Sequence, residues 1–94
     1  MRYRVIVHAP GAGVDEHVLA RLRSVLEQHA VPIGVLRTEE GPHANPLIYL
    51  SSELEAPSSY HVKEVTGRDL FRRVFDEAGL TLPEYPFVLE VERA

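Results

Sequence analysis

Residues 14–29 read VDEHVLARLRSVLEQH, and this stretch decides the fold because its apolar side chains recur every three or four positions. The stripe consists of Val14, Val18, Leu22, Val25 and Leu26. Acidic residues open the stretch, where the helix dipole favours them, and Pro32 follows its end. The pattern predicts a helix over 14–29 that buries this stripe in the core.

Strand patterns precede and follow this helix. Residues 3–8 alternate, with Tyr3, Val5 and Val7 on one face, and this alternation is typical of a strand. Further strands are predicted at 33–37, 46–52 and 87–92. Residues 60–66 leave open one more short strand, although Glu64 interrupts its alternation.

A second helix is predicted over 68–78. Thr66 is a suitable N-cap, with Asp69 three residues on, and Gly79 stands where a helix commonly ends. The apolar stripe of this helix consists of Leu70, Phe71, Val74, Phe75 and Ala78.

The predicted order β-α-β-β-(β)-α-β is that of a ferredoxin-like split βαβ sandwich. We therefore expect an α+β fold in which two helices cover one face of a mainly antiparallel sheet. The 94 residues suit one domain, 1–94. A different α+β arrangement is the alternative.

Composition excludes several classes of function. The sequence contains no cysteine, so it offers no thiolate for catalysis or for metal binding. The net charge of −4 argues against nucleic-acid binding. No apolar run is long enough to cross a membrane, and we expect a cytoplasmic protein without a cofactor. The nine arginines and one lysine are compatible with a GC-rich or heat-adapted genome.

The second face of the sheet is expected to lack a covering layer. The apolar residues predicted for this face are Ile6, Leu36, Leu47 or Tyr49, and Val88. A mostly apolar open face favours self-association, so we predict a homodimer. The alternative is a monomer whose loops cover these residues.

A glycine turn lies between the first strand and the first helix. The backbone N–H groups of Gly11, Ala12 and Gly13 could bind a small anionic ligand there. The turn lacks the third glycine of a dinucleotide fingerprint and the lysine of a P-loop. A tight turn without a ligand is the alternative.

The segment 7–17, VHAPGAGVDEH, resembles the phosphate loop of acylphosphatases, which are ferredoxin-like enzymes, in its Gly13-Val14 pair. The catalytic arginine of that family would fall at His17, and the loop arginine and glutamine at Pro10 and Ala12. These differences remove the catalytic groups, so the resemblance does not imply the activity.

Two further clusters are candidate sites. His43 with Glu39 or Glu40 supplies an imidazole and carboxylates that suit several metals, whereas an exposed polar loop over 38–45 is the alternative. Arg72 and Arg73 on the second helix could form a partner patch, whereas a solvated face with local ion pairs is the alternative.

No catalytic motif is present. We therefore expect a non-enzymatic module that oligomerises or binds a ligand or partner, rather than an enzyme. The alternative is a small enzyme with an anion-binding or histidine-containing site at a subunit interface, which would use His8, His43 or an arginine.

Overall fold

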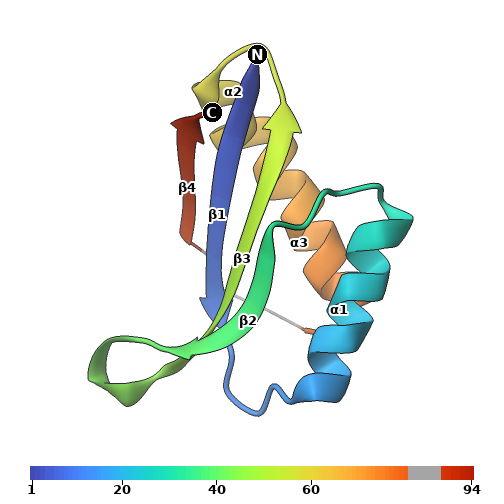
Figure 1. The fold of residues 1–94 in the computed structure, drawn as a ribbon, viewed down its shortest axis with the longest axis vertical. Coiled ribbons are helices and arrows are strands. Elements are labelled where there is room, and N and C mark those ends of the chain that lie inside the picture. The colour runs from blue at the N-terminus through green and yellow to red at the C-terminus, as the bar shows by residue number, and fades with distance from the viewer. Residues whose placement is uncertain (81–87) are drawn as a thin grey trace.

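Helices cover one face of an antiparallel sheet in the computed structural model, which describes residues 1–80 and 88–94 (Figure 1). Its elements, in chain order, are β1 (Arg2–Pro10), α1 (Glu16–Gln28), β2 (Val35–Glu40), β3 (Pro46–Glu55), α2 (Ser59–His61), α3 (Gly67–Glu77) and β4 (Val88–Arg93). A 3₁₀ turn, Pro42–Ala44, joins β2 to β3, and a π-helical turn, Val62–Thr66, joins α2 to α3.

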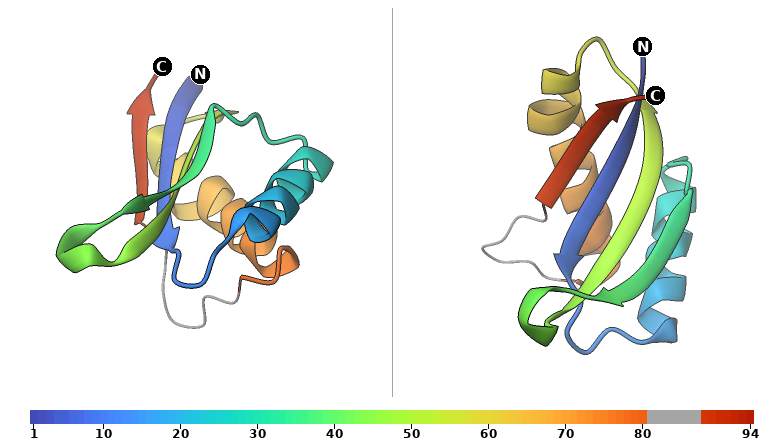
Figure 2. Two further views of the ribbon diagram at one scale, coloured as in Figure 1. Left: turned by 60° about the horizontal axis from the view of Figure 1, so that its bottom comes forward. Right: turned by 60° about the vertical axis from the view of Figure 1, so that its left-hand side comes forward.

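The strand order β2-β3-β1-β4 confirms the ferredoxin-like split βαβ sandwich. β1 lies in the middle and pairs antiparallel with β3, from Arg2 opposite Glu55 to Pro10 opposite Leu47. It also pairs antiparallel with β4, while β3 pairs antiparallel with β2. Figure 2 shows α1 and α3 on the same side of this sheet.

The core lies between the sheet and the two long helices. Alternation along β1 and β3 points every second side chain toward the helices, and these side chains are buried. The core residues of the two strands and two helices include Tyr3, Val5, Val7, Ile48, Leu50, Leu22, Val25, Leu26, Phe71, Val74 and Phe75. Both predicted helical stripes therefore supply the core, as expected.

Helix α1 begins at Glu16, two residues later than predicted. Asp15 is extended and acts as the N-cap, with its carboxylate accepting a hydrogen bond from the Val18 N–H at 3.0 Å. Val14 consequently precedes the helix and is only half-buried.

Residues 60–66 are helical, so the additional strand left open for them is wrong. The helix starts at Ser59, where the Ser58 hydroxyl accepts a hydrogen bond from the His61 N–H at 3.1 Å. Thr66 belongs to the π-helical turn and is not the N-cap.

The β2–β3 hairpin also differs from its predicted bounds. β2 begins at Val35 and continues to Glu40, so residues 38–40, expected in a loop, belong to a strand. The tip turns through His43 and Ala44, whose φ values are 58° and 60°, and the Asn45 N–H donates to the Pro42 carbonyl at 3.2 Å. The predicted start of the last strand at Phe87 lies outside the described residues.

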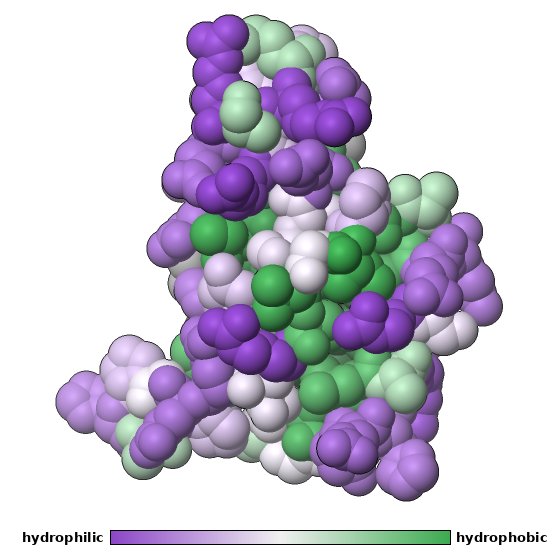
Figure 3. Space-filling model, viewed as in Figure 1, coloured by the Kyte–Doolittle hydropathy of each residue, from purple (hydrophilic) through white to green (hydrophobic). Residues whose placement is uncertain are grey.

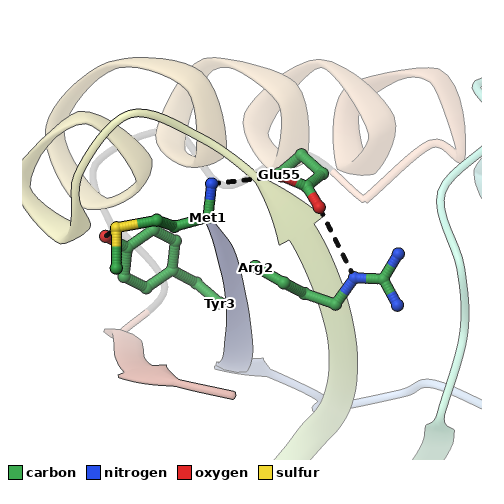
Figure 4. Close-up of polar contacts among 4 residues, drawn as sticks. All are labelled: Met1, Arg2, Tyr3 and Glu55. Atoms are coloured by element: carbon green, nitrogen blue, oxygen red, sulfur yellow. Dashed lines mark hydrogen bonds and ion pairs between the residues drawn. The ribbon is translucent and has the colours of Figure 1, made fainter.

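The start of β1 is tied to the end of β3 by charge. The Met1 ammonium nitrogen lies 3.3 Å from Glu55 Oε2, and Arg2 Nε lies 3.7 Å from Glu55 Oε1 (Figure 4). The Tyr3 hydroxyl donates to the Met1 sulfur at 3.7 Å.

Within the described part of the chain, no helix has the length and apolar character needed to span a membrane.

Candidate functional site

The face of the sheet opposite the helices, called the open face below, mixes apolar and charged side chains. Ile6 from β1 lies there, as predicted, and Leu47 and Tyr49 from β3, which were predicted as alternatives, both lie there, because all three alternate with buried core residues. Leu36 does not, because it pairs with Leu50, whose side chain is buried beneath the helices. Val88 pairs with His8, but its side chain lies outside what the structure describes.

The open face is consequently less apolar than expected. Charged side chains share it, and cross-strand register places Arg4 opposite both Glu53 and Glu92. Arg4 Nη1 lies 3.1 Å from Glu92 Oε1. In the view of Figure 3, apolar colour gathers between β2 and α1, and hydrophilic colours dominate the projecting hairpin.

Four polar and aromatic side chains from three strands meet on this face. Arg37 lies over the ring of Tyr49, with its guanidinium carbon 4.4 Å from the ring centroid. The ring of His8 approaches Tyr49 from the other neighbouring strand, edge to face, with centroids 5.3 Å apart. Tyr49 therefore separates two nitrogen-rich side chains.

Glu39 joins these two side chains. Its Oε1 lies 3.4 Å from His8 Nε2, and its Oε2 lies 3.1 Å from Arg37 Nη2. The His8 and Glu39 side chains are only 25% and 30% exposed, so water screens their contact less than it screens an ordinary surface pair.

A groove of about 520 Å³ opens beside this cluster, between the end of β1 and the hairpin. The hairpin extends beyond the body of the molecule (Figures 1 and 2), and residues from it supply part of the groove lining. The groove is lined by His8, Ala9, Pro10, Glu39, Glu40, Gly41, Pro42 and Leu47.

Close backbone approach explains a glycine at the edge of this groove. A Cβ atom on Gly11 would lie 2.9 Å from the Leu47 carbonyl carbon, so a larger residue would push β1 and β3 apart. The Gly11 N–H donates to the Pro46 carbonyl at 3.0 Å.

These contacts disfavour anion binding at the predicted site of Gly11, Ala12 and Gly13. The Gly11 donor is committed to Pro46, and the first turn of α1 already has the Asp15 carboxylate as its acceptor. The Val18 N–H holds the pKa of Asp15 below its ordinary value of 3.8, so the carboxylate is charged at neutral pH. This negative charge disfavours a second anion at the same turn.

The metal candidates are not gathered into one site. Glu39 contacts His8 and Arg37, and His43 is exposed at the hairpin tip. Among residues 1–80 and 88–94, no group of three histidine, aspartate or glutamate side chains could hold a metal ion.

Arg72 and Arg73, the candidate partner patch, are both exposed on α3. A contact that the sequence did not indicate joins the two helices nearby, where His29 Nε2 lies 2.7 Å from Glu77 Oε2. It ties the end of α1 to the end of α3 and lies away from the groove.

Sequence reasoning missed Arg37, Tyr49 and Leu47 as members of a site with His8. The useful signal is the alternation of β2 and β3, which assigns Arg37, Glu39, Leu47 and Tyr49 to one face once their pairing is known. That pairing is not visible in either strand alone.

No protein-family model matches the chain, and no curated protein matches it significantly. Among solved structures, it is similar to the C-terminal domain of the MgtC protein from Mycobacterium tuberculosis, determined in solution. The TM-score is 0.54 with 13% sequence identity, over 98% of this chain and 87% of that one. The likeness shows that this chain shares the ferredoxin-like fold of that domain, and fold alone does not determine function.

Proposed function

We propose that this domain is a non-enzymatic binding module that forms a homodimer through its open face. The observation that carries the proposal is that, among residues 1–80 and 88–94, helices cover only one side of the sheet, while Ile6, Leu47 and Tyr49 are half-buried on the other. Covering these side chains with a partner removes apolar surface from water.

The charges of the open face support a second copy as the partner. A two-fold interface places a surface against itself, so charged groups in it can be paired only if the same patch carries both signs of charge. Arg4 and Arg37 provide positive charge, and Glu39, Glu53 and Glu92 provide negative charge on the same face. Such a patch can pair each cation with an anion of its copy.

Sedimentation equilibrium from about 5 to about 200 µM tests the homodimer, a range that detects micromolar association. We expect a dimer for the natural sequence and a monomer for Ile6→Arg, since this variant places a charge at the centre of the interface. Arginine suits this position on the single domain because its cross-strand neighbours are Ser51 and Glu90.

Gln28→Arg is the matched control, because it adds the same charge at an exposed position of α1. It should leave the dimer intact. A monomer for the natural sequence contradicts the proposal. So does a dimer that survives Ile6→Arg but is lost when Arg72 and Arg73 are changed to alanine, because α3 would then form the interface.

One observation favours the alternative of a small enzyme, namely the contact between His8 and Glu39 beside the groove. A carboxylate that orients an imidazole is a common arrangement for a general base. Hydrolysis of activated carboxylate and phosphate esters tests this alternative. Turnover that the His8→Gln variant lacks would overturn the non-enzymatic assignment.

The cysteine-free sequence supports a cytoplasmic location. Cell fractionation tests it.

A further inference from the structure

We propose that the groove beside His8 binds an organic cation with a short apolar body, such as a primary amine or a guanidinium group. This site shares Glu39 and Leu47 with the proposed dimer interface, but all of its lining residues come from one chain, so it does not require the homodimer. The argument rests on the charges, the walls and the size of the groove.

The charge of the groove favours a cation. Glu39 is balanced by Arg37 at 3.1 Å, whereas Glu40, which is exposed, has no ion-pair partner among the described residues. Glu39 and Glu40 also line a second hollow of about 290 Å³, together with Thr38, Ala44 and Pro46. Glu39, Glu40 and Arg37 together carry a net charge of −1, which one positive charge complements.

The walls favour an apolar stem on the ligand. Pro10 and Pro42 stand in the groove as rigid rings, and Ala9 and Leu47 add aliphatic surface. Lysine and arginine side chains, and simple alkyl amines, combine methylene groups with a charged end and pack along such surfaces. The volume of about 520 Å³ lies within the range of small-molecule pockets.

The same arrangement disfavours an anion. An anion beside His8 would also lie close to the Glu39 carboxylate, which is 3.4 Å from the imidazole, and Glu40 lines the same groove. Repulsion from both carboxylates would oppose whatever attraction the imidazole supplied.

Amide NMR titrations of the full chain test the proposal with four probes of known charge. Two are cations: n-butylamine represents a free amine, and N-acetyl-arginine amide represents a protein side chain. Two are comparisons: N-acetyl-leucine amide is neutral, and N-acetyl-glutamate amide is an anion. We expect saturable shifts around Ala9 and Gly41 with the cations only. Tighter binding of n-butylamine would identify small amines as the ligands of the groove. Tighter binding of the arginine probe would identify a basic protein segment as its ligand.

The Glu40→Gln variant should weaken the better cation by about two- to fivefold, the range expected for one exposed ion pair. Glu27→Gln, which removes an exposed carboxylate from α1, is the matched control and should leave the affinity unchanged. The amide spectrum of each variant reports whether the fold is retained.

Equal binding of the neutral or anionic probe, shifts confined to other elements, or an unchanged affinity in Glu40→Gln would overturn the proposal. The Ile6→Arg variant separates this proposal from the homodimer. Cation binding that persists in the monomeric variant supports a site within one chain, whereas binding lost with the dimer contradicts such a site.

Discussion

Ala30 has a backbone conformation that favours glycine. Its φ is 55°, and it follows the end of α1. Gly79, with φ of 79°, occupies the equivalent position after α3. Both helices close with the two hydrogen bonds of a Schellman motif: Ala30 N–H to Glu27 O, Val31 N–H to Leu26 O, Gly79 N–H to Asp76 O and Leu80 N–H to Phe75 O, all between 2.9 and 3.0 Å.

The Ala30→Gly substitution should raise the free energy of unfolding by about 0.5–1 kcal/mol. Glycine relieves the strain of the left-handed conformation in the folded state. The greater conformational entropy of glycine in the unfolded chain offsets part of this gain. Gly79→Ala is the reciprocal test and should lower it by about 1–2 kcal/mol, since its Cβ would also lie 3.2 Å from Arg21 Nη1. Urea denaturation followed by circular dichroism measures both. A destabilised Ala30→Gly variant would contradict the assigned strain.

These two residues also show what local sequence can predict. Gly79 marked the end of the second helix, and the structure confirms it. Ala30 carries no such mark, because alanine favours helices. Pro32 nevertheless indicated the end of α1 to within one residue. The left-handed residue that ends α1 at Ala30 is therefore recognised only from its backbone angles in the structure.

At the scale of elements, the π-helical turn explains why residues 60–66 were misassigned. Val62 and Phe71 are both fully buried although they are nine residues apart. In a regular helix, nine residues at about 100° each place two side chains on opposite sides. The extra residue in the turn restores them to one face. A search for a single helical period therefore loses the helix at this point.

Gly67 fits the end of this turn because it lacks a side chain. It is buried, and a Cβ atom there would overlap the Val62 carbonyl oxygen and lie 3.3 Å from Leu89 Cδ2. The turn and β4 therefore both restrict this position.

The Gly67→Ala substitution should lower the free energy of unfolding by about 1–3 kcal/mol, the usual cost of overpacking. Helix propensity alone predicts the opposite sign, because alanine favours a helix by about 1 kcal/mol over glycine. Urea denaturation decides between them. Lys63→Ala, at an exposed position of the same turn, is the control and should change little. A more stable Gly67→Ala variant would show that the turn adjusts to a methyl group.

At the scale of the whole molecule, the candidate site depends on strand order more than on any motif. His8 and Glu39 lie on β1 and β2, with β3 between them, and they meet only because their strands pair at a particular register. Alternation correctly placed Ile6, Leu47 and Tyr49 on the open face. The alternation pattern placed Leu36 on the wrong face. The predicted strand, 33–37, did not include residues 38–40, which continue β2 into the hairpin.

The same strand order divides the sheet into a protected centre and a less protected edge. β1 and β3 each have a neighbour on both sides, and Val5, Val7, Ile48 and Leu50 have no exposed surface. Every residue of the edge strand β2 is exposed or half-buried. Opening β2 therefore exposes little apolar surface, whereas opening β1 disrupts the core.

Native-state hydrogen exchange should reveal this division. Amides of β1 and β3 that face each other should exchange with a free energy within about 1 kcal/mol of global unfolding, and hydrogen-bonded amides of β2 at least about 1 kcal/mol below it. Two-dimensional NMR in deuterated buffer, repeated at low and high protein concentration, measures both sets. Ile6→Arg is the control, because its substitution lies on the open face and should leave the ranking intact. The prediction would be contradicted if amides of β2 exchanged as slowly as those of β1 in the natural sequence and in Ile6→Arg. Because this variant lacks the dimer partner, such slow exchange would mean that the hairpin itself belongs to the stable core.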